Sequence, residues 1–262
     1  MMSECEVSID ASPCLIESSH LLPITTINPI TIGPRVNGCS LSSLGYCSQT
    51  ESLTGDVGPR LEDENCSRIE RVFASFRPLF IIDFDDTLQA TWYLRGEMSK
   101  RSSCLLRRDL TGVDSWACSC MSLCLSLGEV VVLTNSELQW VSYSTENFLP
   151  RLNALLRRVT VVSARDNFSR KYPENPLAWK VHALKDLFPE NTQNQLNHVV
   201  SIGDSHIDHQ AARTLKSNLR KCVYFAKRPS PETLTRQLYK LCSGKLETLV
   251  RDSRSLKIYF DH

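Results

Sequence analysis

Short apolar runs recur along the chain after residue 78, and segments with a helical pattern separate them. The first four runs are continuously apolar rather than alternating, which is typical of strands that are buried on both faces of a parallel sheet. Strands that alternate with helices predict a doubly wound α/β fold. The predicted strands are Leu79–Ile82, Val130–Leu133, Val159–Val162, Val199–Ile202 and Cys222–Ala226.

Polar residues and prolines between these runs predict where helices begin and end. Asp114 can cap a helix that Gly128 ends, and Ser136 can open the next helix. Asn175–Pro176 and Ser230–Pro231 each place a capping side chain before a proline that suits the first helical turn.

The first part of the chain has a different composition. Residues 1–72 contain no Lys and one aromatic residue, Tyr46, and their four Arg against ten Asp and Glu give a charge of −6. Such a segment cannot bury enough apolar surface to offset its chain entropy, so we predict a disordered acidic tail containing Ser, Pro and Gly. Residues 73–262 are the predicted folded domain.

Charge and cysteine content narrow the class of protein. The net charge of +1 supplies no field that would attract nucleic acid or a membrane, and no run approaches the ~18 apolar residues of a membrane span. No secretory signal precedes the eleven Cys, which predicts reduced thiols and a cytoplasmic or nuclear protein. Cys118, Cys120 and Cys124 are close enough in sequence for a metal site, but burial in a helix is favoured because no further ligand follows at zinc spacing.

Carboxylates follow two of the predicted strands. Asp83 and Asp85 come directly after the first strand, and Gly203-Asp204 with Asp208 follow the fourth. The carboxyl ends of parallel strands meet at one edge of a sheet, where these groups would repel one another without a cation. Mg²⁺ prefers carboxylate oxygens and would remove that repulsion. A polar turn that caps the next helix would account for the first pair equally well.

Two further strand-end and helix features suit a phosphate ligand. Thr134 and Asn135 end the second strand with a hydroxyl and free N–H groups, although strands often end in such a cap. Lys180 lies inside the apolar stripe between Leu177 and Leu184 of the predicted helix, where a lysine needs a nearby anion. The alternative is that Lys180 extends along the helix to solvent.

Together these motifs resemble those of the haloacid dehalogenase (HAD) superfamily over roughly residues 79–226. That family has Asp-x-Asp-x-Thr after its first strand, Ser or Thr after its second, a Lys, and Gly-Asp-x-x-x-Asp after its fourth. Here the motifs are Asp83 to Thr87, Thr134, Lys180 and Gly203 to Asp208. The stretches Val162-Ser163-Ala164-Arg165 and Trp179-Lys180 look like a little-characterised eukaryotic branch, which indicates no substrate.

The resemblance implies a Rossmann-like three-layer fold with a parallel five-stranded sheet, and a catalytic role for each motif. Asp83 would be the nucleophile that forms an aspartyl phosphate, and Asp85 the general acid and base. Thr134, Asn135 and Lys180 would hold the transferring phosphoryl group.

The resemblance also implies a magnesium ion. Asp204 would bind it together with Asp83 and the backbone carbonyl of Asp85, and Asp208 would be a further ligand or a neighbour that completes the acidic rim. His206 and His209 flank Asp208, and solvated positions at a helix start are favoured for both over contact with substrate.

The segments after the first and third predicted strands are too short for the cap domain that many HAD members carry, so we expect an open site with a minimal cap. Trp92 and Tyr93 follow the first motif and would contact substrate or pack. The leading hypothesis is a Mg²⁺-dependent phosphatase for a phosphorylated small molecule or a phosphoprotein. The alternatives are transfer to an acceptor other than water and a non-catalytic scaffold acting through its N-terminal tail. The sequence predicts no oligomeric state.

Overall fold

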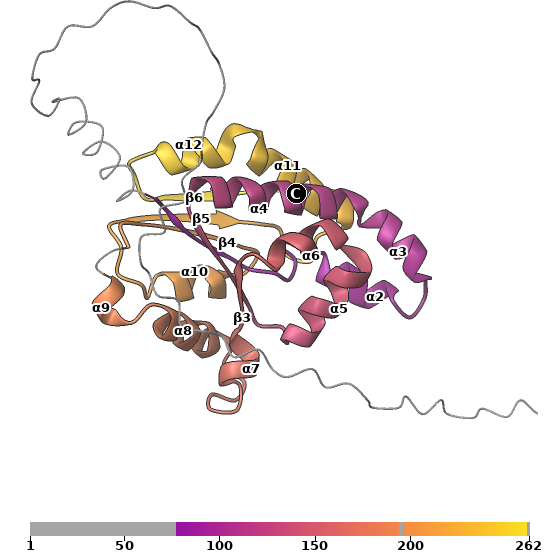
Figure 1. The fold of residues 1–262 in the computed structure, drawn as a ribbon, viewed down its shortest axis with the longest axis horizontal. Helices are drawn as coiled ribbons and strands as arrows, with labels where there is room; N and C mark the ends of the chain where they lie inside the picture. Colours follow the sequence, from indigo (N-terminus) through magenta and orange to yellow (C-terminus); the bar gives the residue numbers. More distant parts are fainter. Residues whose placement is uncertain (1–76, 194–195, 261–262) are drawn as a thin grey trace, which may run out of the picture. The chain divides into compact units, whose positions relative to one another are not determined.

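The computed structural model describes residues 77–193 and 196–260, so the predicted tail over 1–72 lies outside the described residues. Within them, six strands form one parallel sheet in the order β3-β2-β1-β4-β5-β6 (Figure 1). The strands are β1 (Leu79–Ile82), β2 (Glu129–Thr134), β3 (Thr160–Ser163), β4 (His198–Gly203), β5 (Leu219–Tyr224) and β6 (Leu256–Tyr259).

The predicted α/β class is confirmed, but the predicted number of five strands is wrong. The sixth strand, β6, pairs with β5 at the edge of the sheet. In β6 the exposed side chains of Lys257 and Tyr259 alternate with the half-buried ones of Leu256 and Ile258, so this short segment lacks the continuous apolar run of a central strand.

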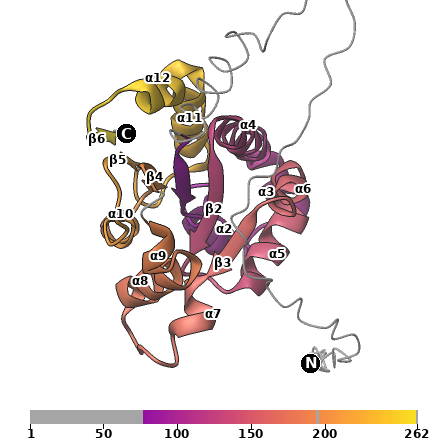
Figure 2. The same cartoon turned by 60° about the vertical axis from the view of Figure 1, so that its left-hand side comes forward.

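Helices cover both faces of the sheet. One face carries α4 (Thr111–Leu127), α6 (Pro150–Leu156), α11 (Pro231–Lys240) and α12 (Leu246–Arg251), and the other carries α8 (Pro176–Leu187) and α10 (His206–Ala212), as Figures 1 and 2 show. The remaining helices are α2 (Thr91–Glu97), α3 (Ser103–Asp109), α5 (Leu138–Phe148), α7 (Ala164–Phe168) and α9 (Glu190–Gln193), and the π-helical turn η1 (Leu241–Lys245) joins α11 to α12.

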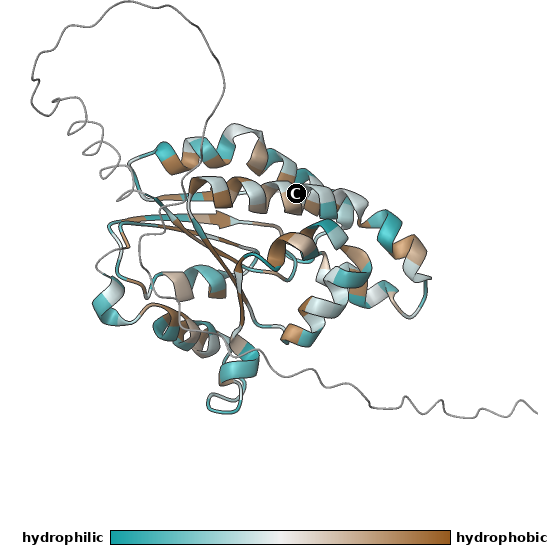
Figure 3. Ribbon diagram, viewed as in Figure 1, coloured by the Kyte–Doolittle hydropathy of each residue, from teal (hydrophilic) through white to brown (hydrophobic). Residues whose placement is uncertain are grey.

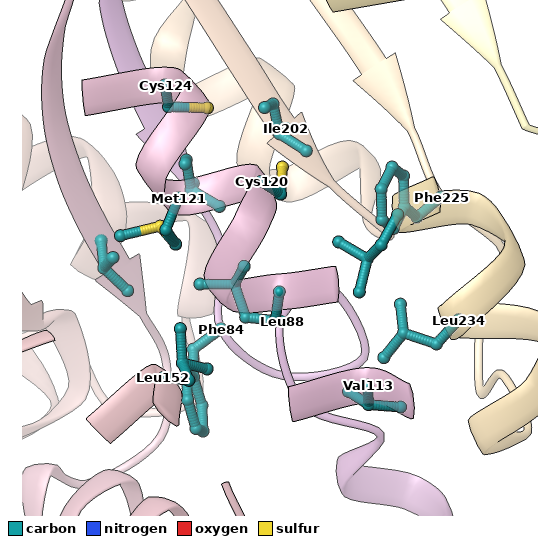
Figure 4. Close-up of a cluster of buried hydrophobic side chains, with 14 of the residues drawn as sticks. Phe84, Leu88, Val113, Cys120, Met121, Cys124, Leu152, Ile202, Phe225 and Leu234 are labelled. Carbon is teal, nitrogen blue, oxygen red and sulfur yellow. The ribbon is translucent and has the colours of Figure 1, made fainter. Parts of the chain in front are cut away.

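Two apolar clusters, one on each face, hold these layers together. Phe80 and Ile82 of β1 point into the cluster under α4, while Leu79 and Ile81 point into the cluster under α8. The strands form the hydrophobic centre of Figure 3, and Figure 4 shows the side chains under α4. Each large apolar side chain buried in this way stabilises the folded state by about 1.5–3 kcal/mol. Strands that bury side chains on both faces therefore hold the sheet between its two helical layers.

Three of the predicted helix boundaries are confirmed. The Asn175 side chain accepts a hydrogen bond from the N–H of Ala178 at 3.0 Å, and Ser230 accepts one from Thr233 at 3.1 Å. Gly128 follows the last residue of α4, where an added Cβ would lie 2.1 Å from the carbonyl oxygen of Pro78. The close approach of these two backbones requires glycine there.

Two predicted helix starts are wrong. The helix α4 begins at Thr111, and the carboxylate of Asp114 instead accepts hydrogen bonds from the N–H groups of Arg151 and Leu152, at 3.2 and 2.9 Å, at the start of α6. Ser136 does not cap α5, which begins two residues later. For Asp114, a contact with a distant helix therefore determines where the carboxylate accepts its hydrogen bonds.

The cysteines of α4 take part in the core. Cys120 and Cys124 are buried, as the helical interpretation predicts (Figure 4). Cys118 is half-buried. Among the helices that the structure describes, none is by itself long and apolar enough to cross a membrane. Only α3 and α4, taken together as a bent pair, have the required length and composition.

Candidate active site

The direction in which the chain adds strands to the sheet reverses between the two central strands, β1 and β4. From β1 the chain adds β2 and then β3 on one side, and from β4 it adds β5 and β6 on the other. Doubly wound sheets bind ligands outside the carboxyl ends of the strands at such a point. Asp83 directly follows β1, and its N–H donates to the carbonyl of Ile202 at 2.9 Å, which holds the ends of β1 and β4 together.

Three of the predicted metal residues meet at this edge. Asp83, Asp204 and Asp208 each offer one carboxylate oxygen, and these three oxygens lie within 4.8 Å of one another. Asp83 and Asp208 are buried and Asp204 is half-buried. The carboxylate of Asp85 is not part of this group, and the role of its backbone carbonyl toward a metal stays a prediction.

Lys180 reaches the acidic cluster from α8. Its Nζ lies 2.5 Å from Oδ1 of Asp83 and 2.5 Å from Oδ1 of Asp208, and the residue is only 2% exposed. The alternative that this lysine extends to solvent is therefore wrong. Burial lowers the pKa of Lys180, but the carboxylates of Asp208 and Asp83 raise it more, so the ammonium group stays charged.

The cluster contains more negative charge than Lys180 neutralises. Burial raises the pKa of Asp83 well above its ordinary value; Lys180 lowers it, and the carboxylates of Asp208, Asp85 and Asp204 raise it further. Burial, followed by the charges of Asp208 and Asp86, raises the pKa of Asp204 to about 7. Without a metal ion, the carboxyl groups at this edge of the sheet therefore tend to be protonated at neutral pH.

Asp85 points toward a different partner from Asp83. Its Oδ2 accepts a hydrogen bond from the Thr134 hydroxyl at 2.9 Å, and its Oδ1 accepts one from Thr91 at 2.7 Å. Thr134 is fully buried, and its oxygen also accepts the N–H of Ser136 at 2.9 Å. Thr134, the last residue of β2, thus holds the Asp85 carboxylate in place.

The turn after β4 explains why Gly203 precedes the acidic residues. An added Cβ on Gly203 would lie 2.4 Å from Oδ2 of Asp208, so any side chain would displace that carboxylate. Asp208 also completes a capping box at the start of α10, in which its Oδ2 accepts the N–H of Ser205 at 3.0 Å. The Asp208 carboxylate therefore binds Lys180, caps α10 and belongs to the acidic cluster.

Asn135, predicted to bind substrate, lies between β2 and α8. Its side-chain amide donates to the carbonyl of Pro176, the first residue of α8, at 3.4 Å. Its Oδ1 is buried and has no hydrogen-bond partner within residues 77–193 and 196–260. The contact places β2 beside the helix that carries Lys180, and the role toward substrate stays a prediction.

Two arginines near the site were not predicted from the sequence. The guanidinium of Arg228 lies 4.0 Å from the ring centre of Trp92, which is 55% exposed. The backbone N–H of Trp92 donates to the Asp86 carboxylate at 2.9 Å. Arg95 lies 4.7 Å from the ring centre of Trp140. Isolated arginines in a loop and a short helix carry no motif, so nothing in the sequence distinguished them.

Tyr93, beside Trp92, packs within the fold rather than facing a ligand. Its hydroxyl donates to Asp109 at 2.7 Å and accepts from Arg101 at 2.5 Å. Of the two aromatic residues after the first motif, Trp92 alone is left exposed at the rim.

The prediction for His209 is wrong, because this residue is only 1% exposed. Its Nδ1 lies 2.9 Å from the Ser201 hydroxyl, and its ring centre is 3.8 Å from that of Tyr224. Burial lowers the pKa of His209 to about 4, so the imidazole is neutral. His206 is exposed, as predicted. Position 209 lies on the inner side of α10, which the local polar sequence does not indicate.

Searches of protein-family models, curated proteins and solved structures find no match to this chain. The resemblance to the HAD superfamily therefore stays a prediction, which depends on the four motifs and on the geometry described above.

Proposed function

We propose that this protein is a HAD-type, Mg²⁺-dependent phosphatase that hydrolyses phosphomonoesters through an aspartyl phosphate on Asp83. The observation that carries the proposal is the convergence of Asp83, Asp204 and Asp208 with the buried Lys180 at the point where the sheet changes direction. A structural ion pair would need one carboxylate for one ammonium group, and this site has a surplus.

The residues present fit a magnesium ion. Three carboxylate oxygens within 4.8 Å form a hard, anionic donor set, and Asp83, Asp204 and Asp208 would hold the ion. When bound, it would favour the ionised, nucleophilic form of Asp83 and neutralise charge on the phosphoryl oxygens.

The other residues then have separable tasks. Lys180 orients Asp83 through its 2.5 Å contact and supplies positive charge to the transferring phosphoryl group. Asp85, held by Thr91 and Thr134, donates a proton to the leaving oxygen and later accepts one from the attacking water. The hydroxyl of Thr134 donates its single proton to Asp85. To bind a phosphoryl oxygen, it would turn this proton from the carboxylate to the substrate.

The proposed substrate has a group that extends beyond the phosphate. Between β1 and α4 the chain forms only the seven-residue helices α2 and α3. Trp92 remains exposed at the rim beneath Arg228, where both would contact the leaving group. Such an open rim suits a bulky ester, including a phosphoprotein.

Hydrolysis of para-nitrophenyl phosphate by the full chain tests this function. We expect activity with Mg²⁺, none in EDTA, and recovery when Mg²⁺ is restored. Asp204→Ala should remove the activity, because it removes a carboxylate of the cluster. Asp186→Ala is the matched control, since Asp186 is an exposed carboxylate on α8, and it should be fully active.

Two results would contradict the proposal. Full activity of the wild type in EDTA would remove the metal from the reaction. Absence of hydrolysis with Mg²⁺, across aryl phosphates, phosphorylated metabolites and phosphopeptides, would exclude a phosphatase even if the site binds the ion.

A further inference from the structure

A cavity lies away from the acidic site, at the amino-terminal half of β5. It has a volume of about 280 Å³ and is lined by the segment between α10 and β5, by β5 itself, and by β6 with the residue before it. Asp208 lies in the first turn of α10, whereas Arg213, at this cavity, follows its last residue. The two sites are therefore at opposite ends of one helix.

The charged side chains that line this cavity are all cations. They are Arg213 after α10, Arg220 of β5 and Lys257 of β6, and Cys222 and Lys257 are paired in the register of the two strands. Over residues 77–193 and 196–260, no Asp or Glu forms an ion pair with any of the three cations. Three neighbouring positive charges repel one another unless an anion lies among them.

Arg220 is fixed in place and still has an unused donor. One terminal nitrogen donates to the carbonyl of Leu215 at 2.6 Å, and its backbone N–H donates to the Ser255 hydroxyl at 3.1 Å. Its Nε is buried and has no hydrogen-bond partner among the residues that the structure describes. A buried guanidinium N–H without an acceptor is costly, and Arg220 is one of the residues that line the cavity.

The buried Cys222 lines the same cavity as the three cations, and it is paired with Lys257 in the register of β5 and β6. Burial raises the pKa of this thiol, while Arg213, Lys257 and Arg220 each act in the opposite direction. Ser217 and Asn218 add hydroxyl and amide groups to the lining.

We propose that this cavity is a binding site for a compact, doubly charged phosphate, separate from the acidic site. Three cations, two of them guanidinium groups, suit a tetrahedral dianion, since Arg binds phosphate oxygens through paired N–H groups. The proposal does not depend on the phosphatase function, because this cavity shares no residue with the acidic site.

Titration of the full chain with inorganic phosphate in EDTA, followed by calorimetry and by amide shifts in NMR spectra, tests the proposal. We expect saturable binding of one phosphate, with shifts at Ser217, Asn218 and Ser255 and none at Thr134 or Asn135. Nitrate at equal ionic strength should produce no such shifts, because it carries a single charge.

Variants at the exposed ends of the site avoid a loss of folding. Arg213→Gln with Lys257→Gln should weaken phosphate binding at least about tenfold, because each substitution removes a charged donor. Lys240→Gln with Arg251→Gln removes two exposed cations from α11 and α12 and should leave the affinity unchanged. Neither pair should alter Mg²⁺-dependent hydrolysis.

Three outcomes would overturn the proposal. The first is unchanged phosphate affinity in the Arg213→Gln and Lys257→Gln variant. The second is an equal response to nitrate, which would indicate general ionic screening. The third is phosphate shifts confined to Thr134 and Asn135, which would place the phosphate in the acidic site.

Discussion

Two buried lysines show what distinguishes the candidate active site from an ordinary polar contact of the core. Lys180 lies 2.5 Å from the carboxylates of Asp83 and Asp208. Lys221, on β5, is fully buried and donates to the backbone carbonyls of Asp252, at 2.6 Å, and Arg254, while the Asp252 carboxylate is 4.0 Å away.

The two environments shift the lysine pKa in opposite directions. Burial lowers the pKa of Lys221, and the distant Asp252 offsets this only in part. For Lys180 two carboxylates outweigh burial and raise the pKa. Lys221 links β5 to the residues that follow α12. Backbone carbonyls there accept its hydrogen bonds, and no surplus of carboxylates surrounds it. A buried charge alone therefore does not indicate function, whereas the surplus of carboxylates around Lys180 does.

The largest expected effect is that of Lys180→Met. This change leaves the buried carboxylates of Asp83 and Asp208 without their cation, and breaking such a pair costs about 3–5 kcal/mol. Urea unfolding in EDTA at pH 8 should show this loss, and phosphatase activity should disappear at temperatures where the variant is folded.

Lys185→Met is the control, because Lys185 is exposed on the same helix. It should change the free energy of unfolding by less than about 0.5 kcal/mol. Wild-type activity in Lys180→Met would remove this lysine from the proposed mechanism.

Lys221→Met should have a smaller effect on stability and none on activity. It leaves the carbonyls of Asp252 and Arg254 without the lysine as a donor, at a cost of about 1–3 kcal/mol. It should also raise the pKa of His198, which burial and then Lys221 lower to about 4, and an NMR titration would measure this. Loss of activity at unchanged stability would contradict the structural role of Lys221.

Asp204→Asn should stabilise the protein in the absence of metal. The pKa of Asp204 is about 7 in the folded protein and about 3.9 when unfolded, so between these values the folded state holds the extra proton. Rising pH therefore destabilises the wild type through this group. In EDTA at pH 8 the variant should be more stable by about 0.5–2 kcal/mol.

The pH dependence is the sharper part of this prediction. The stability difference between Asp204→Asn and wild type should shrink as the pH falls from 7 towards 4, and Asp186→Asn should show no such trend. Mg²⁺ should raise the melting temperature of the wild type but not of Asp204→Asn. A stability difference that is independent of pH would show that burial and the neighbouring carboxylates do not raise the pKa of Asp204.

The sequence predicted one half of the sheet better than the other. Continuous apolar runs identify the central strands β1, β2 and β4, and also β3, an edge strand whose last two residues are buried. The other edge strand, β6, has one exposed face, and β5 has Arg220 and Lys221 near its start, so neither shows that pattern at its true limits.

The candidate site was predicted from strand ends and helical phase, and its rim was not. Lys180 could be chosen because its angle on α8 places it among buried residues, and the structure places it there. Arg95, Arg228 and the inward position of His209 depend on how distant elements pack. The local sequence around each residue is compatible with a solvent-exposed position as well.

The most direct test of the central claim is the mass of the intact protein after brief incubation with an aryl phosphate and Mg²⁺. Asp85→Asn keeps the nucleophile but loses proton transfer, which is worth roughly 10²–10⁴-fold, so hydrolysis of the intermediate should stall. The account predicts one added phosphoryl group on Asp85→Asn and none on Asp83→Asn. A phosphoryl group that persists on Asp83→Asn would contradict the assignment of Asp83, and no adduct on either variant, with the wild type active, would contradict the covalent route.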